Sequence, residues 1–376
     1  MSPPEGPVRV GVVGHGWRAE FFLRLAQSLP QRLRLVGVVA RRPESREAVS
    51  RRWDVPAYGS VGELAREQRP EYAVSSVPWA ANPDVVTELV GHGIPVLCET
   101  PPAPDLPGLT GLWNAVGDAG MVQVAEQYLR LPGHAARRAL VGRGVIGEPT
   151  SVQVSSTHGY HAVSMMRGFL GAGFGPVSVQ ARSFAAPLVD PLSRDGWTHD
   201  DQPRDAATVL ATLDFGGGLS GLYDFTDNQW HNQLRARRVL VRGSRGEIVD
   251  DAVVQLAGPD SIVRGSLVRY QTGHDLNLDG HDTEHISLGL EVLWRNRFSG
   301  LRLMDEEIAM ASLMVDMAAW VRGEGAEPYP LAQACQDHLV SLAIDEALAT
   351  GRVVRTATQP WGAEGAPWGR AQPAQA

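Results

Sequence analysis

The sequence predicts an α/β fold: an N-terminal Rossmann domain with a doubly wound parallel sheet, then a C-terminal α+β domain with a mostly antiparallel sheet. Three observations predict it. An apolar strand runs into a glycine-rich turn near the N-terminus, strands and helices alternate up to residue 125, and strand-like runs dominate after it. A chain of 376 residues is also too long for one ordinary core. We expect domains at 1–126 and 127–361 and a flexible tail at 362–376.

The glycine-rich turn follows the strand at residues 8–13. Gly14, Gly16 and Ala19 form the pattern G-x-G-x-x-A, and an amphipathic helix follows until Pro30. In dinucleotide-binding folds the first glycine permits the tight turn, the second lets backbone N–H groups approach the pyrophosphate, and the small third residue lets helix and strand pack closely. The helix N-terminus attracts phosphate charge. We therefore assign the whole turn to cofactor binding: Gly14, His15, Gly16, Trp17, Arg18 and Ala19.

The remaining elements of the first domain alternate regularly. Further strands are expected at 33–40, 72–77, 94–98 and 121–125, with helices at 44–53, 62–68, 83–92 and 106–119. Right-handed βαβ crossovers make such a sheet parallel. Its carboxyl edge is then the place where a ligand binds.

The second domain follows a different pattern. Helices are expected at 133–144, 160–170, 305–322 and 331–349, and strands at 151–156, 177–184, 208–215, 219–225, 238–241 and 247–249. Residues 256–298 read as loop-rich. The order predicts an antiparallel sheet with helices on one face.

Composition excludes several classes of protein. The net charge is −8, every one of the 34 basic residues is Arg, and basic runs are short, so no nucleic-acid partner is expected. No apolar run is long enough for a membrane span, and the N-terminus does not resemble a signal peptide. Cys98 and Cys335 lie in apolar contexts and are expected to be buried free thiols. We expect a cytoplasmic protein.

The end of the second strand bears on the choice of cofactor. NAD-binding folds usually place Asp or Glu there for the ribose 2′-OH, whereas this chain has Arg41 and Arg42. Arginine suits a 2′-phosphate. NADP or NAD is predicted, with NADP favoured. The alternative is that both arginines form a solvated turn.

Three local patterns together resemble the Gfo/Idh/MocA oxidoreductases, which include glucose–fructose oxidoreductase and inositol dehydrogenase. They are the glycine loop at Gly14, the strand end Val96-Leu97-Cys98-Glu99-Thr100-Pro101, and the run Thr157-His158-Gly159-Tyr160-His161 before an apolar helix. Their order holds over residues 8–355. The resemblance implies a site between the two domains, oxidation of a sugar or cyclitol hydroxyl or reduction of the ketone, and dimers or tetramers formed through the open sheet face.

The chain departs from the family at two catalytic positions. The family's Lys falls on Thr100 and the Asp of its Asp-His pair falls on Thr157, while the His is kept as His161. Because the chain has no Lys, no neighbouring lysine can substitute. Losing such a group typically costs about 10²- to 10⁴-fold in rate. We assign His161 as general acid/base, since imidazole titrates near neutral pH, with Tyr160, Thr100 and Thr157 as further catalytic candidates.

Other polar residues complete the predicted site. Glu99, Gln127, Pro78 and Trp79 follow strands of the first domain and are assigned to the cofactor, Gln127 as a hydrogen-bond donor to cofactor or substrate. No metal site is predicted. His158 and His161 lack a placed carboxylate, and the His281-Asp282-Glu284-His285 run is interpreted as a solvated loop.

Two further segments are rich in polar and aromatic residues. The run from Asp224 to Asn232 follows a strand, and Trp230 within it could stack on a sugar; the alternative is a polar hairpin loop. Residues 190–205 could form a lid or only a surface excursion.

These observations predict an NAD(P)-dependent oxidoreductase acting on a CH–OH or C=O group of a sugar- or polyol-like small molecule. Because the Lys is missing, two alternatives stay open. One is redox-neutral elimination or glycosidic cleavage with retained NAD(P), and the other is a non-catalytic dinucleotide-binding protein. A homodimer or homotetramer is expected.

Overall fold

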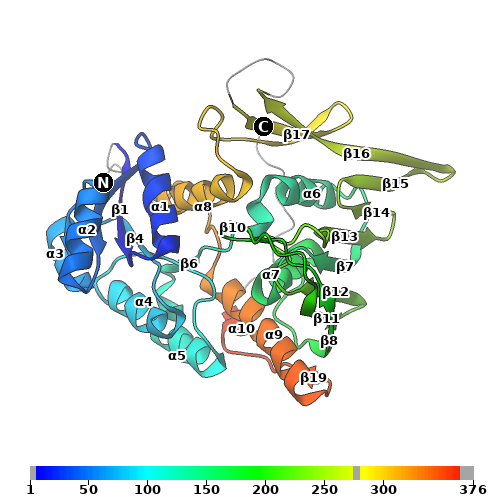
Figure 1. The fold of residues 1–376 in the computed structure, drawn as a ribbon, viewed down its shortest axis with the longest axis horizontal. Coiled ribbons are helices and arrows are strands. Elements are labelled where there is room, and N and C mark those ends of the chain that lie inside the picture. The colour runs from blue at the N-terminus through cyan, green and yellow to red at the C-terminus, as the bar shows by residue number, and fades with distance from the viewer. Residues whose placement is uncertain (1–5, 274–279, 365–376) are drawn as a thin grey trace. The chain divides into compact units, whose positions relative to one another are not determined.

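The computed structural model describes residues 6–273 and 280–364, which form two units (Figure 1). The first unit takes its described residues from 1–131 and 297–335, and the second from 132–296 and 336–376. The sequence had suggested a single boundary at residue 126. The later segment groups with the first unit because helix α8 (Asp305–Val321) packs on it: the Tyr72 hydroxyl donates a hydrogen bond to the Met314 carbonyl at 3.1 Å, and Met314 is fully buried.

The first unit contains a parallel Rossmann sheet in the strand order β3-β2-β1-β4-β5-β6. Its strands are β1 (Val8–Val13), β2 (Leu33–Val39), β3 (Ala57–Tyr58), β4 (Tyr72–Ser75), β5 (Val96–Cys98) and β6 (Val122–Val124). The helices between them are α1 (Trp17–Ser28), α2 (Pro43–Trp53), α3 (Val61–Gln68), α4 (Asn82–Gly91) and α5 (Leu106–Val116). The predicted fold class is confirmed here, and β3 is the strand that the sequence did not predict.

The register of the strands aligns their carboxyl ends in one row across the sheet. Paired residues run across the sheet in the row Val39, Val13, Ser75, Cys98 and Val124. The strands are almost wholly buried because Val and Leu occupy both of their faces, as a sheet covered on both sides requires. The residues that follow this row, among them Gly14, Glu99 and Gln127, therefore emerge at one edge.

The second unit contains an 11-stranded, mostly antiparallel sheet in the described part of the chain. Its order is β18-β17-β16-β15-β14-β13-β7-β12-β11-β8-β19, and β7 and β12 pair in parallel. The central strands are β7 (Pro149–Ser155), β8 (Ser178–Leu188), β11 (Arg204–Gly216), β12 (Leu219–Thr226), β13 (Arg238–Gly243) and β14 (Gly246–Val249); β19 (Val354–Arg355) closes one edge. The mostly antiparallel sheet predicted for the C-terminal part is confirmed.

Alternation along these strands separates two faces. Val152 and Val154 of β7 and Leu213 of β11 are buried, whereas their neighbours Thr212 and Leu222 lie on the other face. Helices α6 (Pro132–Gly142) and α7 (Gly159–Leu170) belong to this unit, and α7 packs against β7. Helix α9 (Leu331–Thr350) begins in the first unit and continues into the second.

The prediction that residues 256–298 are loop-rich is wrong. They carry β15 (Ala252–Gly258), β16 (Ser261–Thr272), β17 (Asp282–Leu288) and β18 (Glu291–Arg295), and Figure 1 shows β15 and β16 as a long projecting hairpin. The pattern was missed because most side chains of β16 are exposed on both faces, so the strand has little period-2 hydrophobicity.

Two remaining expectations concern short segments. The tail predicted at 362–376 is partly helical, since α10 (Trp361–Glu364) enters it, and residues 365–376 lie outside the described part. Cys98 and Cys335 are confirmed as buried free thiols. Within the residues that the structure describes, no helix has the length and apolarity needed to cross a bilayer.

Candidate functional site

The glycine turn leaves β1 in a conformation that only glycine tolerates. Gly14 has a φ of 114°, and a Cβ there would collide with the carbonyl oxygen of Ser76. Gly16 is the N-cap of α1 with no side-chain capping bond, and a Cβ on it would meet nothing within 4 Å. Ala19 is fully buried against the sheet. A tight turn, open space above Gly16 and an uncapped helix N-terminus fit a dinucleotide pyrophosphate.

The side chains of the glycine turn differ in their exposure and in their partners. Trp17 is exposed, with 63% of its surface accessible. His15 is half-buried. Arg18, which the sequence assigned to the cofactor, directs its guanidinium to the carboxylates of Glu99 and Glu306. The side chain of Arg18 is therefore engaged with two carboxylates of the protein.

The ends of β2 and β4 present the other cofactor candidates. Arg41 and Arg42 are exposed directly after β2, and Arg42 lies 3.7 Å from the equally exposed Glu44. Pro78 precedes the short 3₁₀ helix η1 (Trp79–Ala81), where Trp79 is exposed. An exposed arginine pair at the carboxyl edge is available to a 2′-phosphate.

Glu99 connects the glycine turn to Thr100. One carboxylate oxygen of Glu99 accepts from Arg18, and the other accepts from the Thr100 backbone N–H at 2.7 Å and from its hydroxyl at 3.2 Å. Burial alone would lower the pKa of Arg18, but the carboxylates of Glu99 and Glu306 outweigh it, so the net effect raises the pKa and Arg18 stays charged. The hydroxyl of Thr100 is thus a donor already engaged by the protein.

Gln127 follows β6 and is buried, with 4% of its surface exposed. Its Nε2 donates to Glu306 Oε1 at 3.3 Å, while its Oε1 has no hydrogen-bond partner among the described residues. The sequence expected Gln127 to donate to a ligand. In the structure the donor faces Glu306, because a carboxylate only accepts, and the free group is an acceptor.

In the second unit, three candidates surround the start of α7. Thr157 is fully buried and its hydroxyl has no hydrogen-bond partner within the described residues. His158 is the N-cap residue, and its ring lies edge-on to His161 at 5.1 Å. Burial, with a smaller contribution from His161, lowers the pKa of His158 to about 3. His158 is therefore neutral near neutral pH.

Tyr160 and Trp230 extend this cluster. The Tyr160 ring lies 5.3 Å from His161 and 5.9 Å from His338 of α9. Trp230 lies 4.9 Å from His158 and 4.7 Å from Phe225. The two motifs that the sequence treated separately therefore form one aromatic patch.

The excursion at 190–205 is tied to the same patch. Asn228 donates to the Asp190 carboxylate at 2.7 Å, and Asn232 donates to the Val189 carbonyl at 2.8 Å. The excursion carries the short hairpin β9 (Leu192–Ser193) and β10 (Gly196–Trp197), and Trp197 is exposed.

The run at His281–His285 is a strand rather than the predicted loop. Asp282 begins β17, and the His285 ring stacks on Tyr270 of β16 with centroids 4.9 Å apart. No group of three or more His, Cys, Asp or Glu in the described ranges is arranged to hold a metal.

Glu306 is the site residue that sequence reasoning missed. It lies in the first turn of α8 beside Asp305 and Glu307, and acidic residues are common in a first turn because they complement the helix dipole. Nothing in that local pattern separates Glu306 from its neighbours. Only its contact with Arg18, 288 residues away along the chain, reveals it.

The fold and the glycine turn define an α/β protein with a dinucleotide-binding Rossmann unit. Residues 8–126 match the Gfo/Idh/MocA family model, described as an oxidoreductase family with an NAD-binding Rossmann fold. The resemblance to this family inferred from the sequence is confirmed for these residues. The predicted cofactor class, NADP or NAD, agrees with it.

Relatives and solved structures extend the comparison. The trans-1,2-dihydrobenzene-1,2-diol dehydrogenase of Bos taurus is 25% identical over 226 residues, which span 57% of this chain and 67% of that protein. An oxidoreductase from Agrobacterium radiobacter, solved with NAD+, L-tartaric acid and magnesium, has a TM-score of 0.68 at 16% identity and covers 92% of this chain and 98% of its own. A myo-inositol dehydrogenase from Corynebacterium glutamicum has a TM-score of 0.63 at 18% identity, covering 93% and 98%. At these identities the two structures show a shared fold.

Proposed function

We propose that this protein is an NAD(P)-dependent oxidoreductase that acts on a CH–OH or C=O group of a sugar- or polyol-like molecule. The glycine turn carries the proposal: Gly14 makes a turn that other residues cannot, and the space above Gly16 is open. The substrate class is supported by the diol and inositol dehydrogenases to which the chain is similar. A bound dinucleotide would supply the hydride acceptor or donor.

The chain's own residues are assigned the following roles. His161 takes the proton from the substrate hydroxyl or returns it to the carbonyl oxygen. Tyr160 lies beside His161 and positions its ring. Thr100, Thr157 and Gln127 are assigned to hydrogen bonds with the bound molecules, and Arg41 and Arg42 to the 2′-phosphate of NADP.

Dinucleotide binding to a variant of Gly16 tests the proposal. We expect Gly16→Val to keep the thermal midpoint of unfolding, because a Cβ there meets nothing within 4 Å. A bulky side chain would nevertheless occupy the phosphate's place, and we expect NADPH to bind at least about 10-fold more weakly. Fluorescence titration with NADPH and NADH measures both affinities, with NADPH tighter in the wild type. Failure of the wild type to bind either would overturn the proposal.

A second candidate function follows from Thr100. Its side chain carries no charge, and its hydroxyl donates to Glu99. This position therefore offers the substrate no ammonium group of the kind that a lysine would supply. Redox-neutral chemistry with retained NAD(P), or dinucleotide binding without catalysis, fits that observation. Stoichiometric dinucleotide in the purified protein, with no turnover of added NADP+ across a panel of sugars, cyclitols and dihydrodiols, would favour this candidate.

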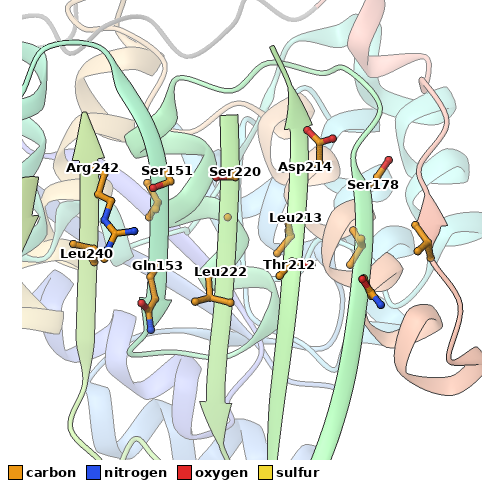
Figure 2. A pocket seen from close by; sticks show the side chains of 15 residues that line it. Ser151, Gln153, Ser178, Thr212, Leu213, Asp214, Ser220, Leu222, Leu240 and Arg242 are labelled. Atoms are coloured by element: carbon orange, nitrogen blue, oxygen red, sulfur yellow. The ribbon is translucent and has the colours of Figure 1, made fainter. Parts of the chain in front are cut away.

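We further propose a homodimer or homotetramer formed through the open face of the second sheet. Figure 2 shows labelled side chains from β13, β7, β12, β11 and β8 around a hollow on this face. Phe184, Leu210 and Leu222 are exposed on it. Apolar side chains gathered on one sheet face are typical of an interface.

We expect Leu222→Asp to reduce the mass measured by light scattering to that of one chain, because a carboxylate cannot be buried there unpaired. Leu290→Asp is the matched control. Leu290 is fully exposed in the turn between β17 and β18, so its replacement should leave the mass unchanged. A multimer that persists in Leu222→Asp would contradict the proposed interface.

The buried free thiols Cys98 and Cys335 fit the proposed cytoplasmic location.

A further inference from the structure

A partly buried polar network in the first unit includes Thr100, the position where the resemblance places the family's lysine. Arg18 lies at its centre and donates to Glu99 and, at 2.6 Å, to Glu306. Glu99 accepts from Thr100, and Glu306 accepts from Gln127. The network thus joins the glycine turn, the ends of β5 and β6, and the first turn of α8.

This network engages one donor on each of the two candidate ligand-binding side chains. Thr100 has one O–H, which it donates to Glu99 at 3.2 Å. Gln127 directs its amide nitrogen to Glu306 at 3.3 Å. Reversing the Gln127 amide would bring its carbonyl against a carboxylate, and two acceptors repel each other. The orientation of this amide is therefore fixed by Glu306.

The consequence is an unpaired acceptor. Gln127 Oε1 is buried and has no hydrogen-bond partner in the part of the chain that the structure describes. Such an atom destabilises the free protein unless a ligand supplies a donor. A lysine, by contrast, would present three donors and no acceptor.

We propose that Gln127 is a specificity-determining residue whose Oε1 accepts a hydrogen bond from the carboxamide N–H₂ of a nicotinamide dinucleotide. This inference rests on the proposed dinucleotide binding. Gln127 directly follows β6 of the Rossmann sheet, whose carboxyl edge also carries the glycine turn. The carboxamide is the N–H donor of the nicotinamide group.

The test compares NADP+ with its 3-acetylpyridine analogue, which replaces the N–H₂ by a methyl group. Calorimetric titration of the full chain, without substrate, should show the analogue binding about 5- to 100-fold more weakly, because the buried acceptor then stays unpaired. In Gln127→Met the two dinucleotides should bind with equal affinity, since the acceptor is gone.

Gln123 supplies a matched control within the same unit. It lies on β6, is buried, and its Nε2 also donates to a glutamate, Glu327, at 3.3 Å. Its Oε1, however, accepts from the Tyr329 backbone N–H at 2.9 Å. Gln123→Met should lower the thermal midpoint and keep the preference for NADP+. Gln127→Met should lower the midpoint less, because it removes an unpaired acceptor.

The possible outcomes distinguish a failure of the proposed dinucleotide binding from a failure of the role proposed for Gln127. Binding of neither dinucleotide to the wild type overturns the proposed function and this inference with it. Equal binding of NADP+ and the analogue to the wild type overturns the inference alone. A preference for NADP+ that survives in Gln127→Met also overturns it, because the donor would then be recognised by another group.

Discussion

Replacing His161 by alanine is expected to lower kcat by about 10²- to 10⁴-fold, the usual contribution of a general acid/base. His161 is half-buried in the first turn of α7. Its neighbours cannot take over: His158 has a pKa of about 3, and burial raises the pKa of the nearby Tyr223 to about 12. The Thr157 hydroxyl is neutral and does not titrate near neutral pH.

The measurement is NADP+ reduction with the best substrate from a panel of sugars, cyclitols and dihydrodiols. The dinucleotide affinity of His161→Ala should equal that of the wild type, since the Rossmann unit is unchanged. His161→Gln should be as slow as His161→Ala, because an amide does not titrate. His158→Gln should lose less activity than either. Wild-type turnover in His161→Ala would show that another group moves the proton.

Loss of Arg167 is expected to destabilise the protein by about 3–5 kcal/mol, the cost of leaving a buried charge uncompensated. Arg167 of α7 pairs with Asp337 of α9 at 2.5 Å, and both side chains are 0% exposed. Arg167 also donates to the Gly173 carbonyl at 3.2 Å, and its guanidinium lies 5.3 Å from the Phe174 ring centroid.

Urea unfolding of Arg167→Met measures this effect. The double variant Arg167→Met/Asp337→Leu should recover a large part of the loss, because it removes both charges. The exposed pair Arg204–Asp200 is the control, and Arg204→Met should change the free energy of unfolding by less than about 1 kcal/mol. A similarly small effect of Arg167→Met would contradict the expected role of the buried pair.

The fold of the first unit could be predicted closely because its signals are local. Buried strands of Val and Leu, glycine turns and amphipathic helices each lie within a few residues of sequence. The strands β15–β18 could not be predicted in this way, since β16, the longest of them, exposes both of its faces and lacks the usual alternation. Helix α8 was predicted, but its place in the first unit depends on burying Met310 and Met314, which local pattern does not show.

Residue order alone established the glycine turn and the cofactor class. These features are covalent or local, so they can be read directly from residue order. The tertiary structure decided where Arg18 points, that Glu306 fixes the Gln127 amide, and that Trp230 lies against His158. Those contacts join residues far apart in the chain, and their geometry exists only when the core has packed.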